Sequence, residues 1–176
     1  MDMSSTTTLV PIAEYLSTSY RPDRDYVDGQ VLERNLGERD HSELQGEILT
    51  YLNVRRRKLG IRAYPEQRVQ VSPTRFRIPD ICVVAGQAPA ELILTSPPFL
   101  CIEVLSKDDR AGDTQERIDD FLAMGVRYVW VVNPRTRRGY VHTTEGSHEA
   151  KDGVLRTADP EITLPLPEIF QEIEAE

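Results

Sequence analysis

The run Pro98-Phe99-Leu100-Cys101-Ile102-Glu103-Val104-Leu105 decides the fold, because a nearly continuous apolar stretch of this length is typical of a central strand buried on both faces. Phe76 to Val84 is a second apolar run, which predicts a neighbouring central strand. Arg62 to Val71 alternates loosely and contains Pro65, which favours an outer strand. Ala85 to Pro97, between the two central runs, predicts a loop.

Two helices are predicted around these strands. Asp40 can cap a helix that runs to about Leu59 and stops at Gly60. Asp113 to Met124 forms a second helical pattern, which Gly125 ends. The apolar residues of the first helix recur at helical spacing, so one of its faces is expected to be buried.

Hairpins are predicted before and after this core. Tyr26 to Arg34 reads as an N-terminal hairpin with Asp28-Gly29 as its two-residue turn. Arg127 to Asn133 predicts a further central strand, with Gly139 to Thr143 as its hairpin partner. The resulting order predicts an α/β fold of the mixed α+β kind, in which helices flank a mixed sheet.

Length and composition bound the class of protein. With 176 residues, 39% of them hydrophobic and 28% charged, the chain is expected to form one folded domain over residues 9–176 after a loose tail at 1–8. We expect a cytoplasmic protein with no membrane partner, since no apolar run is long enough to cross a bilayer and no secretory signal is present. The two cysteines lie inside apolar runs and predict buried free thiols.

The charge distribution leaves two interpretations open. The formal net charge of −8 argues against a generally basic nucleic-acid binder. One segment is nevertheless basic and contains Glu66 as its single acid; its cationic residues are Arg55, Arg56, Arg57, Lys58, Arg62, Arg68, Arg75 and Arg77. This segment could contact a polyanion, or it could be a solvated helix end whose cations favour the helix dipole.

Two carboxylates occur at positions where the strand pattern predicts burial. Glu103 interrupts the central apolar run, and Asp80 follows Pro79 at the start of Ile81-Cys82-Val83-Val84. A buried carboxylate must be paired with a cation or bound to a metal. Carboxylates converging from adjacent strands suit Mg²⁺, whereas a salt bridge from Glu103 to Arg77 or Arg117 is the structural alternative.

These residues carry a resemblance to a known family. Its pieces occur in a fixed order over roughly residues 20–145. They are an acid after a GQVLER-like hairpin, His41 opening a helix, Arg77-Ile78-Pro79-Asp80, Glu103-Val104-Leu105-Ser106, Asp113 with a base four residues on, and Gly125 to Pro134. The ordered set resembles the Uma-type family of restriction-endonuclease-like proteins, within the PD-(D/E)XK nuclease superfamily.

The resemblance implies a metal-dependent endonuclease that hydrolyses phosphodiester bonds in DNA. Asp80, Glu103 and the Val104 carbonyl would hold Mg²⁺ or Mn²⁺, and a nearby cation would stabilise the negative charge of the transition state. The basic residues Arg55, Arg56, Arg57, Lys58, Arg75 and Arg77 would contact the DNA backbone. A homodimer is expected, because cutting both strands of a duplex suits two-fold symmetry.

The sequence departs from this family at the catalytic lysine. The superfamily lysine position, two residues after Glu103, is Leu105, and the family's D-x-x-x-K spacing here ends in Arg117. Arginine keeps the positive charge but cannot act as a neutral amine. Asp113 and Arg117 are four residues apart, so they lie on one helix face and are able to pair. The alternative function is a catalytically impaired nuclease fold that acts as a nucleic-acid-binding or protein-interaction module.

Four further side chains are auxiliary candidates. Lys107 could replace the missing lysine, although a charged loop favours its exposure to solvent. Glu66 could be an additional metal ligand, and Glu47 could reach a second metal from the first helix. Asp113 is included because it begins the D-x-x-x-K spacing.

Overall fold

The computed structural model describes residues 8–35 and 37–175. The tail predicted for residues 1–8 therefore lies, apart from Thr8, outside the described residues. The helices are α1 (Ile12–Ser17), α2 (Arg39–Leu59), α3 (Ala111–Met124) and α4 (Leu166–Glu174). The strands are β1 (Asp25–Val27), β2 (Gln30–Leu32), β3 (Ile61–Pro65), β4 (Val69–Ser72), β5 (Arg75–Arg77), β6 (Ile81–Ala85), β7 (Leu100–Val104), β8 (Tyr128–Asn133), β9 (Arg138–Thr143), β10 (Gly146–Glu149), β11 (Val154–Arg156) and β12 (Thr163–Pro165).

A six-stranded mixed sheet forms the centre, in the order β10-β9-β8-β7-β6-β3. The β7 and β8 strands are parallel, and the other neighbours in this sheet are antiparallel. Every residue of β7 is buried, as its continuous apolar run predicts. The mixed α+β class and the central place of this strand are thereby confirmed.

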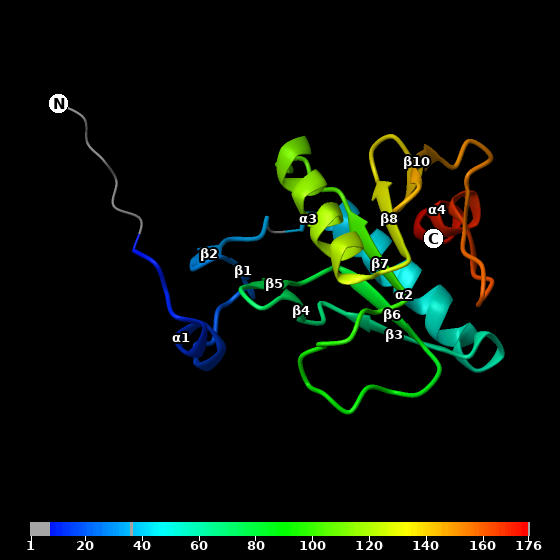
Figure 1. The fold of residues 1–176 in the computed structure, drawn as a ribbon. Helices are drawn as coiled ribbons and strands as arrows, with labels where there is room; N and C mark the ends of the chain where they lie inside the picture. Colours follow the sequence, from blue (N-terminus) through cyan, green and yellow to red (C-terminus); the bar gives the residue numbers. More distant parts are fainter. Residues whose placement is uncertain (1–7, 36, 176) are drawn as a thin grey trace.

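Helices cover the two faces of this sheet (Figure 1). Leu44, Ile48 and Leu52 of α2 pack in the same cluster as Trp130 of β8. On the opposite face, Ile118 and Phe121 of α3 pack with Val129, Val131 and the two cysteines. Alternate residues of a strand point to opposite faces, which explains why consecutive residues of β8 join different clusters.

The pleat of β7 decides where Glu103 points. Ile102 and Val104 belong to the cluster under α2, whereas Cys101 belongs to the cluster under α3. Glu103 is two residues from Cys101 and therefore faces the α3 side of the sheet. Its carboxylate consequently meets the side chains of α3.

The two long helices begin and end close to the predicted residues. Gly60 and Gly125 follow α2 and α3 with φ of 65° and 111°, a left-handed backbone that glycine adopts at little cost. The predicted cap at Asp40 is wrong: α2 begins at Arg39, after Glu38, and Asp40 lies in its first turn.

A second, four-stranded sheet has the order β2-β1-β5-β4. The predicted N-terminal hairpin is confirmed, with β1 and β2 antiparallel and positive φ at both turn residues, Asp28 and Gly29. Tyr26 of β1 pairs with Phe76 of β5, so the N-terminal hairpin adds two strands to the sheet that contains β4 and β5.

Two predicted strands are each divided between the two sheets, which corrects the sequence-based assignment. Phe76 to Val84 breaks at Ile78-Pro79-Asp80 into β5 and β6, because Pro79 has no N–H to donate to a strand neighbour. Arg62 to Val71 breaks after Pro65 into β3 and β4, at Glu66, whose φ is 48°. The first break leaves Asp80 where the two sheets meet.

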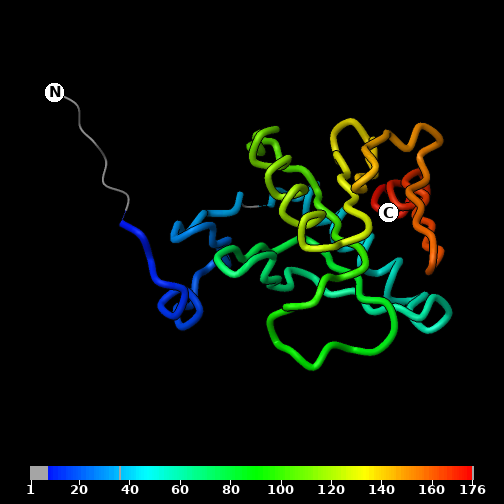
Figure 2. The backbone as a smooth tube through the Cα atoms, in the orientation of Figure 1, coloured from blue at the N-terminus to red at the C-terminus, as the bar shows by residue number. Residues whose placement is uncertain are grey.

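The predicted loop between the central strands is confirmed. Figure 2 shows this segment leaving the sheet after β6 and returning at β7. It is attached midway to the smaller sheet, because Gln70 N donates to Leu94 O and Leu94 N donates to Arg68 O. No helix among the described residues is long and apolar enough to span a bilayer.

The two cysteines give a prediction about chemical reactivity. Cys82 and Cys101 are free thiols with no exposed surface, and burial raises the pKa of Cys82 to about 12. Because the thiolate is the reactive form, we expect neither cysteine to react with a disulfide reagent such as DTNB in the folded protein. Both should react in guanidinium chloride, and rapid labelling of the native protein at neutral pH would contradict this burial.

Candidate active site

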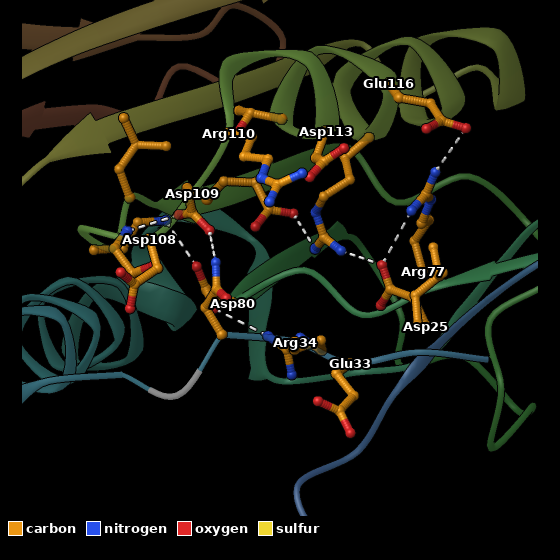
Figure 3. Close-up of a pocket in the computed structure, with 18 of the residues that line it drawn as sticks. Asp25, Glu33, Arg34, Arg77, Asp80, Asp108, Asp109, Arg110, Asp113 and Glu116 are labelled. Atoms are coloured by element: carbon orange, nitrogen blue, oxygen red, sulfur yellow. Dashed lines mark hydrogen bonds and ion pairs between the residues drawn. The ribbon is translucent and has the colours of Figure 1, made fainter.

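A cavity of about 600 Å³ lies where the two sheets, the start of α2 and the start of α3 meet. Its charged lining residues are Asp25, Glu33, Arg34, His41, Arg77, Asp80, Glu103, Asp108, Asp109, Arg110, Asp113, Glu116 and Arg117. Figure 3 shows most of these side chains gathered around the cavity. Eight carboxylates thus face four arginines and one histidine, so the cavity is negatively charged overall.

Asp80 lines this cavity, with its side chain 6% exposed. Its Oδ2 accepts a 2.8 Å hydrogen bond from the Val104 N–H and lies 3.3 Å from His41 Nε2. Its Oδ1 accepts a 3.1 Å hydrogen bond from Arg34, which Figure 3 shows directed toward it. Gln45 of α2 donates to the Asp80 carbonyl. Asp80 is therefore fixed by the second sheet's hairpin, by α2 and by β7.

The surroundings of Asp80 favour its ionised form. Burial opposes the charge, but the contacts with His41, Arg34 and the Val104 N–H outweigh it and lower the pKa of the Asp80 carboxyl. For His41, burial lowers the pKa, and the neighbouring Asp80 carboxylate more than offsets this, so the pKa of the imidazole is raised.

Glu103 is the second buried carboxylate of the cavity. It lies next to Asp80 because the end of β7 pairs with the start of β6, with Ile81 opposite Ile102. Burial raises the pKa of Glu103 to about 7; the nearby Arg117 charge opposes this shift and Asp80 adds to it. Arg117 donates to Glu103 Oε1 at 2.7 Å, and no hydrogen bond of Oε2 is recorded within residues 8–35 and 37–175.

Arg117 connects Glu103 to a third buried acid. Its Nη1 donates to Oδ2 of Asp25 on β1, and its Nη2 also donates to the Ile78 carbonyl at 2.9 Å. Burial lowers the pKa of the guanidinium, but Asp25 and Glu103 raise it by more, so Arg117 stays charged. The salt bridge between Glu103 and Arg117 that the sequence left open as an alternative is present, and the one to Arg77 is not recorded in the described part of the chain.

The ion pair between Asp113 and Arg117 that the helical spacing allows is not formed by the described side chains. Asp113 lines the cavity from the exposed first turn of α3. No ion pair between these two residues occurs among the described side chains, because Arg117 is turned toward Asp25 and Glu103. The helical spacing makes the pair sterically available, but the buried acids hold the arginine more strongly.

Three of the auxiliary candidates lie outside the cavity lining. Glu66 is an exposed turn residue whose backbone N–H donates to the Asp80 carbonyl. Glu47 is half-buried on α2 and does not line the cavity, which α2 instead lines with His41. Lys107 is 55% exposed and pairs with Glu38, as its position in a charged loop favours.

The basic segment is divided in the folded protein. Arg56, Arg57 and Lys58 are exposed in the last turn of α2, about 24 Å along the helix from His41 at the cavity. Arg55 lies over the Tyr51 ring. The other two arginines, which were expected at the DNA backbone, are held by acids instead.

Arg75 bonds to Asp28 and Asp120. Arg77 is 3% exposed and lies between Asp25 and Glu116, as Figure 3 shows, and it also pairs with Asp120. Its burial corrects the expectation that Arg77 contacts DNA, because a guanidinium enclosed by carboxylates has no surface to offer a phosphate.

Sequence reasoning did not select three side chains that make direct contacts in the site. Asp25 begins β1 and Arg34 follows β2, and each reaches its partner across more than 40 positions of the chain. His41 was noted only as a helix-opening residue. The GQVLER-like hairpin and His41 were parts of the family resemblance, so the signal existed, but only the folded chain shows what they contact.

The donor set suits a hard divalent cation. No group of three or more His, Cys, Asp or Glu side chains placed to hold a metal occurs among residues 8–35 and 37–175. Mg²⁺ typically needs one or two carboxylates, with waters and substrate phosphate as the other ligands. Asp80, Glu103 and a backbone carbonyl meet that requirement, and the excess of acids in the cavity favours a cation.

Comparison with known proteins places this fold in a family. A crystal structure described as that of a putative nuclease of DUF820 from Anabaena variabilis ATCC 29413 superimposes with a TM-score of 0.80. It is 20% identical, and the match covers 93% of this chain and 99% of that one. No curated protein is significantly similar to the sequence. The pattern of the Uma2 family, described as "Putative restriction endonuclease", matches residues 13–175. Membership supports a nuclease-like function, and on this match the chain belongs to the Uma2 family.

Proposed function

We propose that this protein is a metal-dependent endonuclease that hydrolyses phosphodiester bonds in DNA, with Mg²⁺ or Mn²⁺ held by Asp80, Glu103 and the Val104 carbonyl. The observation that carries the proposal is the convergence of two buried carboxylates from adjacent strand ends on one cavity. Burying two like charges side by side is costly without cations.

The charge of the cavity supports a bound cation. Eight carboxylates against four arginines and His41 would repel a phosphodiester. A divalent cation held by Asp80 and Glu103 would offset the negative charge of these two carboxylates. When bound, it would polarise the scissile phosphate and lower the pKa of a bound water.

The chain's own residues supply orientation and positive charge. The Val104 N–H and Arg34 fix the two oxygens of Asp80. Arg117 presents a permanently charged guanidinium beside Glu103, where it can stabilise the developing negative charge of the phosphate. His41 orients Asp80 from the start of α2.

The exposed Arg56, Arg57 and Lys58 are the proposed contacts to the DNA backbone away from the cavity, with Arg55 beside them. Because each cleaved strand needs its own site, we further propose that the protein acts as a homodimer.

A second candidate function is supported by the ion pairs. Arg117 on Glu103 and Arg34 on Asp80 already provide counter-charges for the buried acids. A protein whose acids are neutralised internally could keep the fold as a nucleic-acid-binding or protein-interaction module without catalysis.

Cleavage assays distinguish the two functions. We expect the purified protein to cut supercoiled plasmid DNA with Mn²⁺ or Mg²⁺, and EDTA to stop the reaction. Arg117→Ala should lower the rate by about a hundredfold or more, the usual effect of losing a group that stabilises transition-state charge. Salt-dependent DNA binding without cleavage at millimolar metal would favour the module.

A further inference from the structure

We propose that Asp25 is a positioning residue for Arg117: it holds one side of the guanidinium, so that the Arg117 charge is shared rather than concentrated on Glu103. The inference rests on the proposed function, because it concerns the availability of Glu103 as a metal ligand. Because Asp25 begins β1, the hairpin of the smaller sheet then has a role in the site: it supplies the residue that positions Arg117.

The first argument is the way Asp25 is delivered to the site. It is the first residue of β1 and is 2% exposed. The pairing of β1 with β5 aligns the hairpin with the residues just before Asp80. Asp25 Oδ1 consequently accepts the Ile78 N–H at 3.1 Å, while Oδ2 faces Arg77 at 3.3 Å and also binds Arg117.

The second argument is the difference between its two arginines. Arg77 has other acids, since its Nε donates to Asp120 at 2.7 Å and Glu116 lies 3.5 Å from its Nη2. Arg117 has one other carboxylate recorded in the described part of the chain, which is Glu103. Loss of Asp25 therefore leaves Arg77 paired but leaves the whole Arg117 charge to Glu103.

The consequence concerns metal binding. Arg117 and a divalent cation compete for the negative charge of Glu103. With Asp25 in place, one guanidinium nitrogen is engaged elsewhere and the group is held from both sides. Without it, Arg117 binds Glu103 more tightly, so the affinity for the metal falls. Removing a group that orients a metal site typically weakens binding by about ten- to a hundredfold.

The first experiment needs no metal. In the metal-free protein, ¹⁵N NMR of the arginine side chains should show separate Nη signals for Arg117, identified by their loss in Arg117→Ala, because contacts on both sides hinder guanidinium rotation. Asp25→Asn should merge these signals, and Asp120→Asn, which removes an acid of Arg77 but none of Arg117, should leave them separate. Separate Arg117 signals in folded Asp25→Asn would overturn the proposal.

The second experiment measures Mn²⁺ affinity by calorimetry in a double-mutant cycle. Asp25→Asn should raise the Kd about tenfold in the wild-type background and leave it unchanged in an Arg117→Ala background, whereas Asp120→Asn should not alter it. An equal rise in both backgrounds means that Asp25 acts on the fold and not through Arg117, and overturns the proposal. Absence of Mn²⁺ binding in the wild type contradicts the proposed function, while the NMR result still decides whether Asp25 positions Arg117.

If Asp25→Asn gives no cooperative melt, Asp25→Glu takes its place. The glutamate carboxylate can still accept the Ile78 N–H and pair with Arg77, but its longer side chain displaces the oxygens that bind Arg117. A smaller rise in Kd that again disappears with Arg117→Ala is the expected result, and a wild-type Kd would overturn the proposal.

Discussion

Glu103→Gln should reduce metal-dependent DNA cleavage by about a hundredfold or more, because a catalytic metal contributes several kcal/mol of transition-state stabilisation. The amide oxygen can still accept the hydrogen bond of Arg117, while the negative charge that would attract the cation is gone. The rate of plasmid cleavage at saturating Mn²⁺ is the measurement. The stability of the folded protein should change little, since the substitution removes a charge that is costly to bury.

Glu116→Gln is the matched control for this change. Glu116 lines the same cavity from α3 but is 47% exposed and lies beside Arg77 and Arg75. Its loss should change the cleavage rate by less than about threefold, because rim charges contribute little. Equal effects of the two substitutions would contradict the assignment of Glu103 as a metal ligand and would indicate that the rate depends on the total charge of the cavity.

Arg77→Ala should be the most destabilising substitution of a single charge in the network. Its guanidinium is 3% exposed and satisfies Asp25 and Asp120. Removing it takes one of two counter-charges from each acid, because Asp25 keeps Arg117 and Asp120 keeps Arg75. Breaking a buried ion pair costs up to about 3–5 kcal/mol, and the remaining arginines keep the expected loss below that limit. The free energy of unfolding, measured by urea denaturation with tryptophan fluorescence from the buried Trp130, is the observable.

Arg138→Ala provides the comparison at the surface. Arg138 is 63% exposed and lies 3.5 Å from Glu149 on the neighbouring strand. Such a pair contributes at most about 1 kcal/mol, so the urea midpoint should stay near that of the wild type. If Arg77→Ala were equally mild, the buried ion-pair network would not be a major contributor to the stability of the fold.

The parts of the fold that the sequence predicted are those specified by local signals. The apolar run around Glu103 identified β7, and Gly60 and Gly125 identified the ends of α2 and α3. Each of these signals lies in the segment of sequence that it describes. The two sheets could not be separated in this way. The apolar patterns around Pro79 and Glu66 look continuous in the sequence, although each strand breaks there. Strand partners that are distant in the chain decide which sheet each half joins, so the local pattern does not show the break.

The same limit applies to the site. Asp80 and Glu103 were found because a carboxylate within an apolar strand is anomalous wherever its partners come from. Asp25 and Arg34 carry no such local anomaly, since both lie in polar surroundings along the chain. Arg34 meets Asp80 across 46 positions and Asp25 meets Arg77 across 52. Arg77 was misjudged for the same reason, because the acids that enclose it, Asp25, Glu116 and Asp120, are distant from it in the sequence.

The most direct test of the metal site is thermal unfolding with and without Mn²⁺, compared between the wild type and Asp80→Asn. A ligand at 100 times its Kd stabilises a protein by about 2.7 kcal/mol, which for a chain of this size raises Tm by several degrees. We predict that rise in the wild type and its loss in Asp80→Asn, with Asp108→Asn, a change at another acid of the cavity, retaining it. No rise in the wild type at millimolar Mn²⁺, or an equal rise in Asp80→Asn, would contradict a metal held between Asp80 and Glu103.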